Sequence, residues 1–128
     1  MIDHITIDVS EYAACRAFYT SALNPLGYVV LAEFSLEGVQ ICGFGVAPKP
    51  DFWISGPCSK SRTTFNNHFA FRAEARSQVD EFYLAALENG GTDNGTPGLR
   101  PHYHANYYGA FVLDPDGNNI EAVCHLPA

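Results

Sequence analysis

The chain has 128 residues, of which 47% are hydrophobic and 16% charged, and its formal net charge is -7. This length suits one domain that buries roughly two-thirds of the surface exposed by its unfolded form. No apolar run approaches the ~20 residues of a membrane helix. The Lys and Arg residues are too scattered to form the basic stripe that phosphate binding needs. We therefore expect an ordinary globular protein that binds neither membranes nor nucleic acid.

The start of the chain and its cysteines bear on location. The first residues enter a strand-like pattern without the basic start and apolar centre of a signal peptide. No C-x-x-C pair is formed by the cysteines, which are Cys15, Cys42, Cys58 and Cys124. This usage is typical of buried or free thiols in a reducing compartment rather than of disulfides or a zinc cluster. We therefore expect a cytoplasmic protein.

The first half of the chain predicts a strand, a helix and three further strands. Apolar residues alternate over residues 3–9, as in a half-buried strand. A helix is predicted from Ser10, its N-cap, to about Leu23, where Asn24 and Pro25 end it. Turn residues then separate three predicted strands, at 28–34, 39–46 and 51–55.

The second half repeats this order after a polar connector at 57–66. It predicts a strand at 67–73, a helix from about Arg76 to Asn89 and a weak strand near Thr92. Two strands follow, at about 107–113 and 118–124. They are joined by the tight-turn sequence Asp114-Pro115-Asp116-Gly117.

The two halves, about 1–56 and 67–128, are copies of one module. With a shift of 64 residues, half the length of 128, several residues coincide. The matching pairs are His4 with His68, Phe18-Tyr19 with Phe82-Tyr83, Ala22-Leu23 with Ala86-Leu87, and Gly27 with Gly91. A histidine thus opens the first strand of both copies, on the face with more polar or small residues. A site built where the modules meet explains this coincidence.

A carboxylate on the last strand completes a candidate metal site. Alternation places Glu121 on the face opposite the small apolar residues Ile120 and Ala122. With His4 and His68 it forms a set of two imidazoles and one carboxylate, which suits a divalent first-row metal with open positions. Zinc, iron, manganese and nickel would all fit. Taken singly, each residue is better explained as a hydrogen-bonded strand histidine or a rim charge, and only the combination favours a metal site.

A second cluster of reactive side chains precedes the last hairpin, at Arg100-Pro101-His102-Tyr103-His104 and Tyr107-Tyr108. If this segment is extended, His102 and His104 share a face and could relay protons, bind metal or, with Arg100, contact an anionic substrate. The turn-rich stretch 94–98 would let it fold over a cup. A surface loop with incidental histidines is the open alternative. The candidate catalytic residues are His102, His104 and Tyr108, and the candidate substrate contacts are Arg100, Trp53, Tyr103 and Tyr107.

Phe52 and Trp53 are neighbours on a predicted strand, so their side chains face opposite ways. One of them should lie in the core and the other should line the cup. The Phe-Tyr pairs of the two helices, by contrast, are best explained as packing residues.

The motif from Asp114 to Glu121, together with the two strand-opening histidines, resembles the vicinal oxygen chelate superfamily. This superfamily includes glyoxalase I, bleomycin and fosfomycin resistance proteins, and extradiol dioxygenases. The resemblance covers the whole chain and implies an α+β fold of two βαβββ modules whose curled mixed sheets form a cup. It further implies His4, His68 and Glu121 as metal ligands, and a homodimer, since single-chain proteins of this kind usually pair.

The chain departs from parts of the family pattern. Aligning Pro48 with Pro115 sets Ile54 opposite Glu121, where glyoxalase I has a fourth, carboxylate ligand, so glyoxalase I activity is not expected. The tyrosine that extradiol enzymes place three residues before the Asp-Pro turn is Phe111. Ring cleavage therefore depends on a substitute hydroxyl, from Tyr107 or Tyr108.

The sequence thus predicts a metal-dependent lyase, transferase or dioxygenase that chelates a small oxygen-bearing molecule through two oxygens. The alternative is a non-catalytic protein that sequesters a planar ligand, as bleomycin resistance proteins do. Its ligand would stack on the aromatic residues Trp53, Tyr103, Tyr107 and Tyr108. A homologue that has lost its chemistry is a third reading.

Overall fold

The computed structural model describes residues 1–58 and 67–128. Most of the connector predicted at 57–66 lies outside the described residues. The first module contains β1 (Ile5–Asp8), α1 (Tyr12–Ala22), the short 3-10 helix η1 (Asn24–Leu26), β2 (Val29–Leu36), β3 (Val39–Gly45) and β4 (Phe52–Gly56). The second contains β5 (His68–Arg72), α2 (Arg76–Glu88), β6 (Thr92–Leu99), β7 (Tyr108–Leu113) and β8 (Asn119–Cys124). None of the helices in the described part of the chain has the length and apolarity to cross a membrane.

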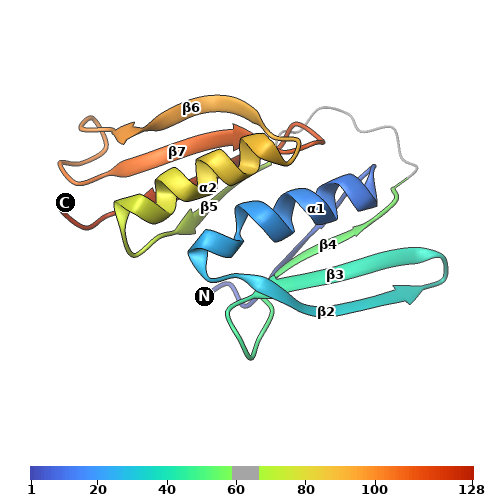
Figure 1. Ribbon diagram of the computed structural model, residues 1–128. Helices are drawn as coiled ribbons and strands as arrows, with labels where there is room; N and C mark the ends of the chain where they lie inside the picture. The colour runs from blue at the N-terminus through green and yellow to red at the C-terminus, as the bar shows by residue number, and fades with distance from the viewer. Residues whose placement is uncertain (59–66) are drawn as a thin grey trace.

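Each module forms its own mixed sheet (Figure 1). The strand orders are β1-β4-β3-β2 and β5-β8-β7-β6. The outer pairs β1/β4 and β5/β8 are parallel, and the remaining pairs are antiparallel. The predicted α+β fold of two βαβββ modules is thereby confirmed. Among the described residues no strand of one sheet is hydrogen-bonded to a strand of the other.

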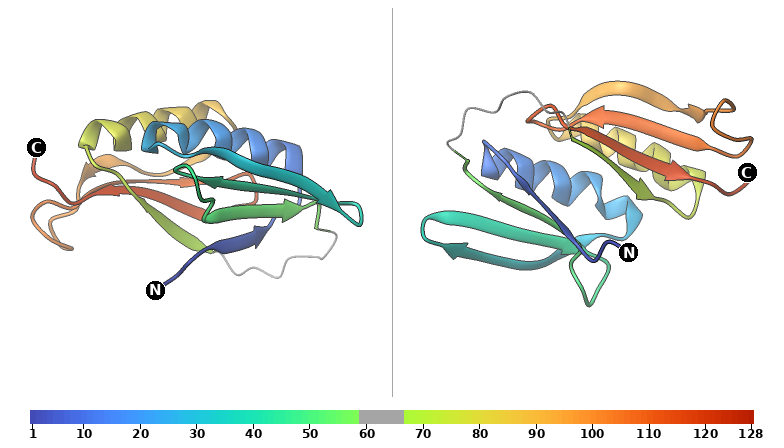
Figure 2. Two further views of the ribbon diagram at one scale, coloured as in Figure 1. Left: turned by 90° about the horizontal axis from the view of Figure 1, so that it is seen from below. Right: turned by 180° about the vertical axis from the view of Figure 1, so that it is seen from behind.

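Both helices cover the same side of the molecule, and the two sheets lie on the other side (Figure 2, left). Strand alternation turns Phe52 and Ile54 of β4 toward the helices, where they are buried with Phe18 and Tyr19 of α1 and Phe82 of α2. The predicted packing role of the helical Phe-Tyr pairs agrees with this core. One face of each sheet stays free of helices, and of the candidate site residues on the strands, Trp53, His68 and Glu121 lie there.

A buried carboxylate ties the first module to the second. Asp114, 4% exposed in the β7–β8 turn, accepts a 2.5 Å hydrogen bond from the Tyr19 hydroxyl of α1. Burial, reinforced by Asp114, raises the pKa of Tyr19 well above its usual value, so the phenol remains a donor. Two residues on in the same turn, Asp116 accepts hydrogen bonds from the Ser10 amide, at 2.9 Å, and from the Ser10 hydroxyl.

These hydrogen bonds explain why Ser10 does not form the predicted N-cap of α1. Helix α1 begins at Tyr12 with Glu11 in the N-cap position and no side-chain cap. The hydroxyl of Ser10 is engaged by Asp116 instead, a contact across 106 residues that no local helix signal encodes.

At the edge of the second sheet, the strand predicted near Thr92 is confirmed, but the turn predicted at 94–98 was wrong. Strand β6 begins at Thr92 and runs along β7 for 8 residues, so residues 94–98 belong to the strand. Its register shifts twice around Gly95, whose φ of 149° few other residues adopt. Glycine and proline signal turns in general, but on an edge strand they also fit bulges, which explains the error.

The cysteines agree with the sequence prediction of thiols. Cys15, Cys42 and Cys124 are buried, and Cys58 is half-buried. Burial, assisted by Glu33, raises the pKa of the Cys42 thiol to about 11. Cys42 therefore behaves as a small core residue rather than as a nucleophile.

Candidate metal and substrate site

Two of the three predicted metal ligands lie together in the second module. The parallel pairing of β5 with β8 brings His68 beside Glu121, with 3.2 Å between Nε2 and the Oε2 atom. The Nδ1 atom of His68 lies 3.0 Å from the carbonyl oxygen of Asn119. Because a carbonyl only accepts, Nδ1 carries the proton and the ring presents Nε2 to the carboxylate. Such an outer hydrogen bond is how metal-binding histidines are usually oriented.

The second oxygen of Glu121 is held by Tyr107, whose hydroxyl donates to Oε1. Burial and, to a smaller extent, the hydrogen bond to this carboxylate raise the pKa of Tyr107. Its hydroxyl therefore stays protonated and remains a donor. Gly109 leaves room for the pair, since a Cβ there would lie 3.2 Å from both Glu121 Oε1 and the Tyr107 ring. Sequence reasoning offered Tyr107 as a substrate contact and missed its bond to Glu121.

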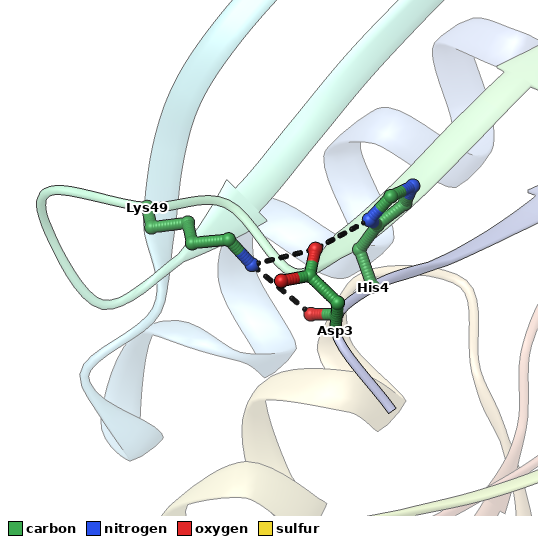
Figure 3. Close-up of polar contacts among 3 residues, drawn as sticks. All are labelled: Asp3, His4 and Lys49. Atoms are coloured by element: carbon green, nitrogen blue, oxygen red, sulfur yellow. Dashed lines mark hydrogen bonds and ion pairs between the residues drawn. The ribbon is translucent and has the colours of Figure 1, made fainter. Parts of the chain in front are cut away.

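The third predicted ligand, His4, lies in the first module, apart from His68 and Glu121. It precedes β1, and its Nδ1 atom donates to Asp3 at 2.7 Å, while Lys49 Nζ lies 2.9 Å from the same oxygen (Figure 3). The hydrogen bond from His4, then that from Lys49, lowers the pKa of Asp3. In the described part of the chain, no three His, Cys, Asp or Glu side chains are close enough to hold a metal ion. One chain thus brings together His68 and Glu121 but not His4.

The strand registers correct the predicted position of the fourth ligand. Thr6 pairs with Trp53 in the first module, and Ala70 pairs with Glu121 in the second. Thr6 and Ala70 are each two residues after the strand-opening histidine, so Trp53, not Ile54, is the counterpart of Glu121.

The physical reason for this error is the length of the preceding turn. Pro48 precedes Trp53 by five residues, whereas Pro115 precedes Glu121 by six, so aligning the prolines shifts the strand by one. A shift of one residue reverses the face of a strand. Ile54 accordingly points into the core and is 0% exposed. Neither position carries a carboxylate, so the chain lacks the fourth ligand of glyoxalase I in either alignment.

Trp53 lines a hollow of about 460 Å³ on the helix-free face of the first sheet. The centroids of its ring and the Phe34 ring are 6.3 Å apart and their planes cross at 67°. Phe52, its neighbour, is 1% exposed in the core, so the predicted opposite orientation of the two side chains is confirmed. A second hollow, of about 550 Å³, lies between the modules and reaches His68.

The segment before β7 is not extended, so the condition set for His102 and His104 is not met. Residues 101–103 form a turn in which His102 packs against Tyr103 with ring centroids 4.2 Å apart. His104 accepts the Asn106 amide at Nδ1 and therefore carries its proton on Nε2, which lies 2.8 Å from Nδ1 of His125. His125 was missed because it follows the last strand and lies outside every motif.

Two further candidates separate onto opposite faces of the second sheet. Tyr108 donates to Asp80 of α2 at 2.7 Å, so it points to the helix side, away from Glu121. Arg100 keeps to the side of Glu121, its guanidinium carbon 5.6 Å from the ring centroid of Phe111. Phe111 in turn stacks on His68 at 6.2 Å and 24°. Phe111 therefore links Arg100 to the imidazole of the half-site.

The chain is thus a pair of βαβββ modules, the second of which brings His68 and Glu121 together on the helix-free face of its sheet. The family model described as Glyoxalase/Bleomycin resistance protein/Dioxygenase superfamily matches residues 1–122. The chain belongs to this superfamily.

Solved structures of the superfamily share the fold. A glyoxalase/bleomycin resistance protein from Albidiferax ferrireducens T118 is 27% identical, with a TM-score of 0.74 and 98% of each chain covered. A family enzyme from Burkholderia phytofirmans PsJN is 18% identical, with a TM-score of 0.71 and 98% of each chain covered. Glyoxalase I from Zea mays is 20% identical with a TM-score of 0.73, and 96% of this chain spans 45% of the maize chain. Among curated proteins, no sequence matches.

Proposed function

We propose that the protein is a metal-dependent enzyme that acts on a small oxygen-bearing molecule through His4, His68 and Glu121. The observation that carries the proposal is the Glu121 carboxylate, which is 2% exposed yet faces an imidazole nitrogen at 3.2 Å. A buried carboxylate needs a cation or several donors to offset its lost hydration. Two imidazoles and one carboxylate suit a divalent Fe, Mn, Zn or Ni ion. When bound, such an ion supplies stabilisation of negative charge on two substrate oxygens.

The remaining residues of the second module have separate roles in this proposal. Tyr107 fixes Glu121 through Oε1, so that Oε2 would be the oxygen to bind a metal ion. Arg100, on the same side of the sheet, donates hydrogen bonds to an oxygen of the substrate. His104, whose ring centroid lies 5.5 Å from that of Tyr107, carries protons at the edge of the site. Tyr108 and His102 are not part of the proposal, because one faces α2 and the other packs against Tyr103 in an exposed turn.

We further propose a homodimer in which His4 of one chain joins His68 and Glu121 of the other. The separation of these residues within one chain supports it. So do Val29 and Leu36 on the edge strand β2, which are 43% and 60% exposed and favour burial against a second copy. The maize chain, of which this chain spans 45%, is long enough for two such pairs of modules.

The test is the metal content of protein purified without an affinity tag or added metal. His4→Ala, His68→Ala and Glu121→Ala should each lose most of the bound metal while staying folded, and His102→Ala should retain it. Near-stoichiometric metal in all three variants would overturn the metal site.

Co-expression separates a shared site from one within a single chain. A mixed dimer of His4→Ala and Glu121→Ala chains retains one site with every ligand intact if the site is shared. It should therefore regain metal that neither variant holds alone. Recovery of no metal in verified mixed dimers would place all the ligands within one chain.

A further inference from the structure

At equivalent positions beside the site, the two modules carry cross-strand pairs of different chemical character. In the second module, Phe111 pairs with Glu121 across β7 and β8. In the first, Gly43 pairs with Trp53 across β3 and β4. The position that offers a carboxylate in one module therefore offers an indole in the other.

Gly43 is what allows the indole to lie over the sheet. A Cβ on this residue would fall 2.6 Å from the Trp53 ring, closer than real Cβ contacts allow. The ring of Trp53 therefore occupies the space above the backbone of β3, and its pose would change with any other residue at this place. Phe34 meets it nearly edge to face, which stabilises this arrangement.

We infer that the hollow over Trp53 binds the planar aromatic body of the substrate, with Trp53 as the specificity-determining residue. This inference rests on the proposed function, because the hollow is also lined by His4. Its volume of about 460 Å³ falls within the range of small-molecule sites. Phe34, Ile41 and Trp53 form apolar walls, and aromatic rings are the groups that gain most from such partners.

The charges around the hollow favour a ligand without a full negative charge. Lys49, the cation in its lining, is already paired with Asp3 at 2.9 Å, and His4 lies against the same carboxylate (Figure 3). The chain as a whole has a net charge of -7, which disfavours anions further. A neutral, hydroxyl-bearing aromatic compound satisfies both conditions.

The experiment uses 2-naphthol and its saturated counterpart decahydro-2-naphthol as probes on the metal-free full-length protein. Calorimetry should give a dissociation constant about tenfold lower for the planar compound, because only it can stack. Trp53 is the single tryptophan of the chain, so its fluorescence should change saturably with the same midpoint.

Variants locate the binding. Trp53→Ala should weaken naphthol binding about tenfold. Gly43→Ala should weaken it as well while retaining the tryptophan, because the added Cβ displaces the ring. Leu84→Ala, on the exposed surface of α2, is the matched control and should bind as the parent does.

Equal affinity for the two probes, or unchanged naphthol binding by Trp53→Ala, would overturn the inference. So would tryptophan fluorescence that stays constant at saturation, the result expected if a second copy fills the hollow. Because the protein is free of metal throughout, loss of the metal site leaves these results intact. Failure of the proposed function and failure of this pocket are therefore distinguishable.

Discussion

The two modules share one strand order but present different chemistry on their helix-free faces. The first exposes Trp53 over Gly43 in an apolar hollow. The second buries Glu121 between His68 and Tyr107. Duplication has kept the backbone register while the facing side chains diverged. One module can therefore supply shape and the other polar ligands, a division of roles that a single module could not provide.

The turns that precede β4 and β8, the last strands of the two modules, also differ in their polar contacts. Asp114 of the second module is buried and bonded to Tyr19 of α1, whereas the residue that precedes the corresponding proline of the first module is Ala47. The second turn is thus anchored in the core by Asp114, whereas the carboxylate of the first turn, Asp51, hydrogen-bonds Tyr28 outside α1. The fixed position of β8, and with it of Glu121, follows from this anchor.

The contrast between Trp53 and Ile54 gives the largest expected effect. Ile54→Glu places a carboxylate in the core at a position that is 0% exposed, and should cost about 4 kcal/mol or more of stability. Trp53→Glu, one residue away on the open face, should fold and bind metal more tightly if a fourth oxygen donor reaches the ion. Urea unfolding and metal titration measure the two effects. A stable Ile54→Glu beside an unfolded Trp53→Glu would reverse the assigned register.

Because the fourth carboxylate is missing, we also predict that the parent protein does not catalyse the glyoxalase I reaction. With an indole where glyoxalase I has its acid, no positioned base remains to move the proton of the methylglyoxal hemithioacetal. The parent should therefore leave this adduct unchanged in a spectrophotometric assay. Clear isomerisation by the parent would show that another group supplies the base.

The order and type of the elements followed from local sequence, because alternation, helix ends and tight turns are written in neighbouring residues. The errors share a cause in contacts between distant residues. Ser10 binds Asp116 rather than capping α1, and Gly95 sits in a bulge of an edge strand rather than in a turn. Trp53 and Ile54 were exchanged because one turn is a residue shorter, which only the pairing registers reveal.

The candidate site was predicted in the same uneven way. The pairing of His68 with Glu121 was predictable, since parallel strands with a known face must bring them together. The bond from Tyr107 to Glu121 depends on how the segment before β7 turns, and nothing in the local pattern of residues 100–107 specifies that turn. The separation of His4 depends on how the modules associate, which a periodicity cannot encode.

The anchor in the second turn predicts an intermediate effect. Asp114→Ala removes the acceptor for the Tyr19 hydroxyl and for the amides of Asp116 and Asn118, at 2.9 and 2.8 Å. Leaving these donors unpaired in a buried place should cost about 3 kcal/mol. Urea unfolding at fixed protein concentration measures it, with Tyr19→Phe as the partial control that removes one donor alone. A cost below about 1 kcal/mol for Asp114→Ala would show that the turn is held by other contacts.

Tyr107→Phe should produce the smallest change, and it tests the half-site directly. The variant keeps the ring but removes the hydroxyl that donates to Glu121 Oε1, so the carboxylate loses the partner that fixes its orientation. Outer hydrogen bonds to metal ligands are worth about tenfold or more in metal affinity. Competition with a chromophoric chelator should therefore show about tenfold weaker binding in a protein that remains folded. Tyr103→Phe is the matched control, because this residue is 59% exposed and contacts Tyr107 only ring to ring, with centroids 4.8 Å apart. Equal metal affinity in both variants and the parent would mean that the Tyr107 hydroxyl does not orient the ligand.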